Sequence, residues 1–328
     1  MNGYIGDPYQ LYGVLPYELS EGKGRGMRLL HLKNGKGLEM DVSLDRNGDI
    51  SSLSYKGTNL SYLSSCGYVH SSYYERKGNG FLSSFTAGFL TTCGLTHFGA
   101  SCVDEGEELG LHGSIANTPT SNHSYEVKES SILVRSETRD EEIFSHKLVL
   151  NREIEMSLDA NRFSIHDLVS NRGDIASPLM LLYHMNLGYP LLDEDAELKV
   201  SSLSVQPRTA HAKEGLESWM RMEKPQRGYI EKCYYHEMKD PPYACLFNPK
   251  LGFGVKISYE PSSLTHFVEW KMMGYRDYVL GLEPGNAYPD GRDKARADGS
   301  LKTIAPGETI SYDVCVEIVD KEEFDKLN

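Results

Sequence analysis

The sequence predicts one large antiparallel β-sandwich. Short stretches such as Leu38–Leu44 alternate apolar and polar residues, which is the pattern of a strand with one buried face. Turn residues such as those at 45–49 separate these stretches roughly every 8–12 residues, a spacing typical of antiparallel all-β folds. Helical patterns are scarce and no low-complexity linker divides the chain, so we expect a single domain.

The N-terminal region differs from the rest of the chain. Residues 1–26 are rich in Gly, Tyr and Pro and predict an irregular arm, which leaves 27–328 as the sandwich domain. The first predicted hairpin joins Met27–Leu32 to Leu38–Leu44 through Asn34-Gly35-Lys36-Gly37, whose residues tolerate positive φ.

The same pattern continues to the C-terminus. Further strands are predicted at Ile50–Tyr55, Tyr125–Lys128, Ser131–Glu137, His146–Leu150, Glu153–Leu158, Arg162–Val169, Pro178–Leu182, Tyr243–Phe247, Gly254–Tyr259 and Tyr312–Ile318. We expect a turn or two of helix within Tyr73–Phe85 and a terminal helix within Lys321–Leu327.

Composition indicates a soluble globular protein and limits its partners. The formal net charge of -13 disfavours nucleic acid and anionic membrane surfaces, and it suits a neutral small molecule. No apolar stretch is long enough to span a bilayer, and the N-terminus lacks the pattern of a signal peptide, so we expect a cytoplasmic protein. The six cysteines form no CxxC pair and do not cluster with histidines at zinc spacing, which predicts reduced thiols and no metal site.

The stretch Tyr183–Pro190 is the first candidate for a functional site. It follows the apolar run Pro178–Leu182, so a buried strand places His184 on a rigid element. A core histidine bonded to a neighbour would give the same pattern. Glu283 likewise ends an apolar strand that Pro284 stops, where desolvation would raise the pKa of the carboxyl toward that of a general base. A strand-end carboxylate capping a loop is the alternative. Together the two residues supply the components of general acid–base catalysis.

Other residues are weaker candidates. His112 precedes Gly113 in a predicted turn, where a histidine is commonly structural. Trp270 suits stacking on a sugar ring and suits a core equally well. Lys271 and Arg76 are candidate rim contacts, although a solvated surface charge is the simpler interpretation of Arg76.

Four motifs in order resemble those of the aldose 1-epimerase (galactose mutarotase-like) superfamily. They are Thr92-Cys93-Gly94-Leu95, Leu111-His112-Gly113, the run Tyr183-His184-Met185-Asn186-Leu187-Gly188-Tyr189-Pro190-Leu191-Leu192, and Gly281-Leu282-Glu283-Pro284-Gly285-Asn286. The resemblance is to a divergent bacterial branch of unknown function and runs from about residue 27 to the C-terminus. It implies a large antiparallel β-supersandwich.

The resemblance also implies roles for individual residues. His184 corresponds to the general acid, Glu283 to the general base and His112 to a histidine that binds the sugar. Asn186 and Asn286 lie within the motifs and are expected to contact substrate, and Glu231 corresponds loosely to a carboxylate that binds sugar hydroxyls. No cofactor is needed for this reaction. Cys93-Gly94 and Ser114 stand where typical members carry an Asn-Arg pair and an Arg, which leaves the sugar open.

Two other functions fit the same fold. A glycoside hydrolase or lyase would need two facing carboxylates, for which Glu269 and Glu283 are the candidate pair. A sugar-binding protein without catalysis would need neither. We expect the epimerase to place His184 and Glu283 on opposite sides of one pocket, with His112 and Trp270 beside them. The protein would act as a monomer or homodimer on a small sugar.

Overall fold

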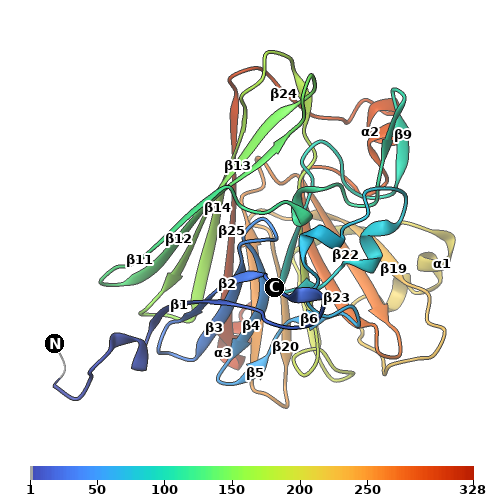
Figure 1. Ribbon diagram of the computed structural model, residues 1–328. Coiled ribbons are helices and arrows are strands. Elements are labelled where there is room, and N and C mark those ends of the chain that lie inside the picture. Colours follow the sequence, from blue (N-terminus) through green and yellow to red (C-terminus); the bar gives the residue numbers. More distant parts are fainter. Residues whose placement is uncertain (1–2) are drawn as a thin grey trace.

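Antiparallel β-sheets form the framework of the computed structural model, which describes residues 3–328. Sheets of eight, six and five strands dominate, and they pack against one another around a shared core (Figure 1). The predicted all-β fold is therefore confirmed.

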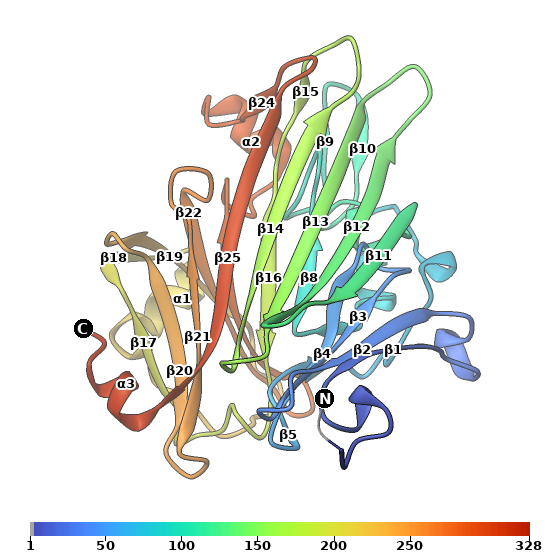
Figure 2. The same cartoon turned by 90° about the vertical axis from the view of Figure 1, so that its left-hand side faces the viewer.

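The eight-stranded sheet forms one broad face of the molecule (Figure 2). Its strands, in spatial order, are β11 (Asn122–Val127), β12 (Ser131–Glu141), β13 (Lys147–Ser157), β14 (Arg162–Asn171), β25 (Thr309–Asp320), β21 (Phe253–Tyr259), β20 (Tyr243–Asn248) and β17 (Glu197–Val200). The closing strand β25 pairs with β14 on one side and β21 on the other, so the C-terminal part of the chain joins two halves of the sheet.

The six-stranded sheet carries the motif residues. Its order is β18 (Ser202–Pro207), β19 (Lys232–Met238), β22 (His266–Met273), β23 (Tyr278–Gly285), β16 (Leu182–Leu187) and β8 (Leu90–Cys93). The five-stranded sheet is a meander of β1 (Gly13–Glu18), β2 (Arg28–Lys33), β3 (Leu38–Ser43), β4 (Asp49–Tyr55) and β5 (Thr58–Asn59).

Short elements connect these sheets. Two-stranded ladders pair β6 (Tyr62–Leu63) with β7 (Ala87–Gly88), β9 (Cys102–Asp104) with β10 (Glu107–Leu109), and β15 (Ser177–Pro178) with β24 (Thr303–Ile304). The α-helices are α1 (Ala210–Glu214), α2 (Arg292–Ala297) and α3 (Lys321–Asp325). Single 3-10 turns occupy Pro8–Gln10, Gly22–Gly24, Ser71–Tyr73, Gly80–Ser83, Ile115–Asn117 and Leu216–Ser218. The helical turns expected within 73–85 and the terminal helix expected within 321–327 are thus present, with shorter bounds.

Alternating side chains of the sheets build the core. Val134 of the eight-stranded sheet, Tyr183 and Leu282 of the six-stranded sheet and Leu30 of the five-stranded sheet belong to one buried cluster. Because one face of β16 and β23 meets this cluster, the residues that alternate with Tyr183 and Leu282 point to the opposite face of the sheet.

Three sequence predictions need correction. Two strands were expected at His146–Leu150 and Glu153–Leu158, but the structure has the single continuous strand β13. The expected irregular arm at 1–26 contains a regular strand, since Gly13–Glu18 pairs residue by residue with β2 and completes the five-stranded sheet. The strand expected at Pro178–Leu182 is interrupted between β15 and β16. There the N–H groups of Leu179, Met180 and Leu181 bond to the Lys302 carbonyl, the Leu95 carbonyl and the Asn286 side chain, so only part of this run has a neighbouring strand.

Candidate active site

Two neighbouring strands place the acid–base candidates together. β16 pairs with β23 so that Leu182 lies opposite Gly285 and Met185 opposite Leu282, a register that puts His184 opposite Glu283. Both strands are buried along their whole length. The side chains of His184 and Glu283 therefore emerge side by side from the middle of the sheet, on the face away from the main core.

The pair is close and nearly enclosed. His184 Nε2 lies 3.3 Å from Glu283 Oε1, and the two side chains are 6% and 3% exposed. This arrangement corrects the expectation that the two residues face the pocket from opposite sides. Cross-strand neighbours on one face of a sheet are adjacent by geometry, so the acid and the base share one wall.

A glycine makes room for the carboxylate. Gly281 lies two residues before Glu283 and on the same face of β23. A Cβ at Gly281 would lie 2.2 Å from Glu283 Oε1 and 3.0 Å from the Cβ of Trp270. The absence of a side chain at this position therefore allows the carboxylate to lie against the sheet and to face His184.

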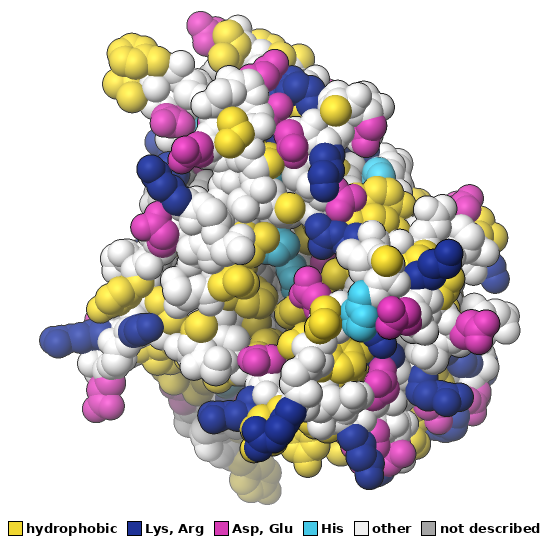
Figure 3. All heavy atoms as spheres, turned by 90° about the vertical axis from the view of Figure 1, so that its right-hand side faces the viewer, with side chains coloured by type: hydrophobic (Ala, Val, Ile, Leu, Met, Phe, Trp, Pro, Cys, Tyr) yellow, Lys and Arg dark blue, Asp and Glu magenta, His cyan; other side chains and the backbone are white. Residues whose placement is uncertain are grey.

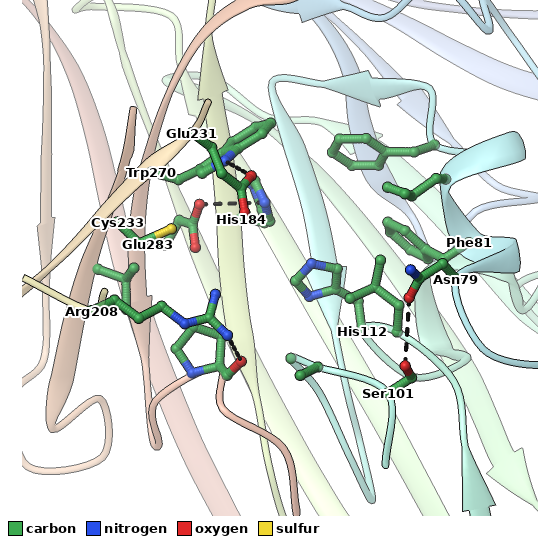
Figure 4. Close-up of a pocket in the computed structure, with 17 residues that line it drawn as sticks. Asn79, Phe81, Ser101, His112, His184, Arg208, Glu231, Cys233, Trp270 and Glu283 are labelled. Carbon is green, nitrogen blue, oxygen red and sulfur yellow. Dashed lines mark hydrogen bonds and ion pairs between the residues drawn. The ribbon is translucent and has the colours of Figure 1, made fainter. Parts of the chain in front are cut away.

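The pair forms part of the wall of a cavity of about 350 Å³. Figure 3 shows the hollow near the middle of one face of the molecule, with histidine deep inside it. Figure 4 shows His184, Glu283, Glu231 and Arg208 on one side and His112 and Phe81 on the other. The lining residues are Asn79, Phe81, Leu82, Phe85, Gly99, Ala100, Ser101, Leu111, His112, His184, Arg208, Glu231, Cys233, Val268, Trp270, Glu283 and Pro289.

Aromatic contacts fix the histidine ring. The rings of Trp270 and His112 lie edge to face with that of His184, at centroid distances of 5.2 and 5.6 Å. Trp270 is itself oriented by Glu231, because its Nε1 donates a hydrogen bond of 2.7 Å to Glu231 Oε2. His112 adopts a positive φ of 60°, so the turn that Gly113 continues directs its ring into the cavity.

Burial shifts the protonation of the site toward neutral groups. Loss of solvent lowers the pKa of His184 to about 4, against a smaller opposing effect of Asn186. It raises the pKa of Glu283 well above its usual range; the nearby Glu231 charge adds to this, and the Arg208 charge opposes it. The pKa of His112 is lowered by burial and by the neighbouring His184. Removing charged groups from water explains the first and largest part of each shift.

The structure brings five of the nine predicted site residues into this cavity: His112, His184, Glu231, Trp270 and Glu283. Lys271 is on the opposite face of β22 because it follows Trp270, and its ammonium group binds the carbonyls of Ser218 and Arg221. Its predicted contact with substrate is therefore wrong.

Three more predicted contacts lie outside the cavity. Asn186 is fully buried and its side chain donates a hydrogen bond to the backbone carbonyl of His184, so it stabilises β16. Asn286 is also buried, and its amide bonds to the backbone of Leu179 and Leu181. Arg76 is exposed and lines a separate hollow with His97 and His146. The prediction that these residues bind substrate is corrected accordingly.

The pair of carboxylates considered for hydrolysis is also separated by the sheet. Glu269 is fully buried on the core side of β22, where its Oε2 lies 3.5 Å from His236 Nε2. Glu269 and Glu283 therefore do not face one cavity, and the hydrolase interpretation loses its candidate pair.

Sequence reasoning missed Arg208. This residue follows β18 and reaches the cavity from the edge of the sheet, with Nε 3.0 Å from Asp290 Oδ1 and a second nitrogen bonded to the Pro289 carbonyl. It also missed Phe81, Phe85 and Leu111. A sequence feature that could have identified the two phenylalanines is the run Gly80-Phe81-Leu82-Ser83-Ser84-Phe85. Its apolar side chains have no strand pattern, so they are expected to pack outside the sheets.

Within residues 3–328 no group of three or more His, Cys, Asp or Glu side chains is arranged to hold a metal ion. The six cysteines are all unpaired. No helix in the described part of the chain is long and apolar enough to cross a membrane.

Solved structures share the fold. A protein from Klebsiella pneumoniae subsp. pneumoniae MGH 78578, provisionally named an aldose 1-epimerase, superposes with a TM-score of 0.90 at 24% identity, covering 96% of this chain and 86% of that one. A galactose mutarotase-like protein from Clostridium acetobutylicum gives 0.69 at 15% identity, with 95% and 99% covered. The galactose 1-epimerase of Lactobacillus acidophilus NCFM gives 0.62 at 13% identity, with 94% and 99% covered. These likenesses establish a galactose mutarotase-like fold and confirm the resemblance seen in the motifs.

Sequence comparison gives the family. No curated protein matches the chain. A family model described as a domain of unknown function, DUF4432, matches residues 24–318, which is most of the sequence. The chain therefore belongs to the DUF4432 family, and it carries the galactose mutarotase-like fold.

Proposed function

We propose that the protein is an aldose 1-epimerase, which interconverts the α and β anomers of a free sugar by acid–base ring opening. The observation that carries the proposal is the His184–Glu283 contact of 3.3 Å at an open cavity. A proton donor and a proton acceptor that both reach one small ligand are what this reaction requires.

The chemistry follows from the two side chains. Glu283 takes the proton of the anomeric hydroxyl while His184 gives a proton to the ring oxygen, and the bond between C1 and the ring oxygen breaks. Rotation about the C1–C2 bond exposes the other face of the aldehyde, and ring closure returns both protons. Each positioned proton transfer contributes typically about 10²–10⁴-fold.

The burial of the pair is compatible with this scheme. Because burial raises the pKa of Glu283 and lowers the pKa of His184, the pair holds one proton at pH values between these two pKa values. If that proton shifts from Glu283 to His184, whose Oε1 and Nε2 atoms lie 3.3 Å apart, the neutral form becomes the carboxylate–imidazolium form that starts the reaction. Arg208 favours this form, because its charge lowers the pKa of Glu283.

The test is exchange between anomeric NMR signals on a panel of aldoses. We expect saturation transfer between the α and β signals of at least one aldose, above the rate in buffer. His184→Asn and Glu283→Gln should each lower kcat by about 10²–10⁴-fold, because each removes one proton transfer. The double variant should lose little more than either single one, since the groups act on one bond as a unit.

Surface variants provide matched controls. His166→Asn changes a histidine that pairs with Asp313 on the eight-stranded sheet, and Glu126→Gln changes an exposed glutamate of β11. Both should exchange anomers at the wild-type rate. If Glu283→Gln also does so, its assignment as the base is wrong. If the wild type binds aldoses and exchanges none of them, the protein is a sugar-binding protein without catalysis.

A further inference from the structure

The candidate active site has two chemically different sides. Glu283, Glu231 and Arg208 line the side formed by the six-stranded sheet and its edge (Figure 4). The side across the cavity carries Phe81, and Phe85 and Leu111 line the cavity as well. These three residues come from the segments that precede β7 and follow β10. We call these three residues the apolar wall.

The apolar wall is a rigid part of the protein interior. Phe81 and Phe85 are 2% and 8% exposed, and their rings lie 5.1 Å apart within a buried cluster against which Leu111 also packs. Rings and aliphatic groups offer a ligand no hydrogen bond. Asn79 and Ser101 at the margin are bonded to each other, and His112 lies deeper, between Phe81 and His184.

Charge at the site disfavours an anionic ligand. Arg208 is the one cationic side chain among the residues that line the cavity. Its guanidinium group lies 3.0 Å from the Asp290 carboxylate, and its charge also lowers the pKa of Glu283. Glu231 is within reach of the same cavity and is bonded to Trp270. A phosphate, sulfonate or carboxylate on the sugar would meet Glu231 and Glu283 and would compete with carboxylates of the protein for Arg208.

A sugar whose anomeric carbon contacts His184 and Glu283 would occupy the cavity that the apolar wall also lines. Ring substituents that face this wall meet only aromatic and aliphatic groups. A hydroxyl there loses water and finds no partner, whereas a methyl or methylene group gains apolar contact. We propose that the substrate is a neutral deoxy aldose, in which at least one hydroxyl of the parent sugar is replaced by hydrogen. This rests on the proposed function for the site and adds the substrate class.

Matched pairs of sugars test the proposal. We would measure anomer exchange on D-galactose and 6-deoxy-D-galactose, D-glucose and 6-deoxy-D-glucose, and D-ribose and 2-deoxy-D-ribose, with binding followed separately by calorimetry. The deoxy member of at least one pair should be preferred about 10–100-fold in kcat/KM, the range that an apolar pocket gives against an added hydroxyl.

A variant links the preference to the apolar wall. Leu111→Asn introduces an amide into the apolar wall. It should raise kcat/KM for the hydroxylated sugar, so that the ratio of kcat/KM for the deoxy sugar to kcat/KM for the hydroxylated sugar falls at least threefold. Leu203→Asn, at an exposed leucine of β18 outside the cavity, is the matched control and should leave the preference unchanged. Circular dichroism checks that both variants are folded.

The outcomes separate the substrate class from the reaction. If kcat/KM for the hydroxylated sugar equals or exceeds that for the deoxy sugar in every pair, the deoxy proposal is overturned and the epimerase proposal is retained. Tighter binding of deoxy sugars without anomer exchange supports the substrate class and overturns the reaction. If no sugar of the panel binds, the deoxy proposal is overturned too.

Discussion

Gly281→Ala is the sharpest test of the geometry at the acid–base pair. Its Cβ would lie 2.2 Å from Glu283 Oε1, the oxygen that faces His184. Ordinary carbon–oxygen contact needs a little over 3 Å, so the carboxylate must move by roughly 1 Å. A displacement of this size at reacting groups costs about 10²-fold in rate, and we therefore expect kcat to fall about a hundredfold.

The assay is anomer exchange on a sugar that the wild type turns over, together with thermal unfolding. The backbone of Gly281 is not in the left-handed region, so alanine should be tolerated and the protein should stay folded. Gly6→Ala is the control, because a Cβ there would meet only the Gln10 side chain at 3.7 Å. This variant should retain wild-type exchange.

One result would refute the reasoning. If Gly281→Ala is folded and exchanges anomers at the wild-type rate, the position of Glu283 Oε1 does not control the reaction. Loss of exchange with an intact far-ultraviolet spectrum and unchanged sugar binding would support it, since binding and catalysis then separate as the geometry requires.

Three further predictions concern protonation and stability. The rate of anomer exchange should depend on pH as a bell-shaped curve. The rate falls below a pKa of about 4, where His184 is protonated and the pair holds two protons, and it falls again above the raised pKa of Glu283, where the pair holds none. A pH–rate profile measures both limbs. Lys271→Met should leave kcat within about twofold but lower the free energy of unfolding by about 1–3 kcal/mol, because two backbone carbonyls lose their donor. Arg152→Leu should lower the free energy of unfolding, measured with urea, by about 3–5 kcal/mol, because the buried carboxylates of Asp49 and Asp167 lose their cationic partner. A smaller decrease would mean that both carboxyl groups are protonated in the variant.

Local patterns predicted the strands well. Stretches with period 2, such as that of β3, appear as strands because one face of each meets the core. The arm at 1–26 was mispredicted because β1 contains Pro16 and Gly13 and only one of its residues, Gly13, is buried. An edge strand tolerates these residues, and its pairing with β2 comes from a partner that no local pattern reveals.

The site was predictable in its chemistry and less so in its arrangement. His184 and Glu283 stood out in the motifs, but their contact depends on the register of β16 against β23, which is set by residues about 100 positions apart. The sequence alone could have excluded Lys271 from the site of Trp270, because successive residues of a strand point to opposite faces of the sheet. Asn186 and Asn286 could not have been excluded in this way. No local sequence pattern distinguishes an asparagine whose amide bonds to the backbone from one whose amide faces a ligand.

The one-proton state of the pair connects the fold to the proposed chemistry. Anomer exchange moves a proton from the anomeric oxygen to the ring oxygen and back, so a catalyst that starts with one shared proton ends with one. A sheet that buries both groups disfavours a doubly protonated and a fully deprotonated pair alike, since each carries a net charge in a poorly solvated place. The same burial makes His184 a weak base and Glu283 a weak acid, and it keeps the number of protons on the pair at one, which is the number that the proposed reaction needs at every step.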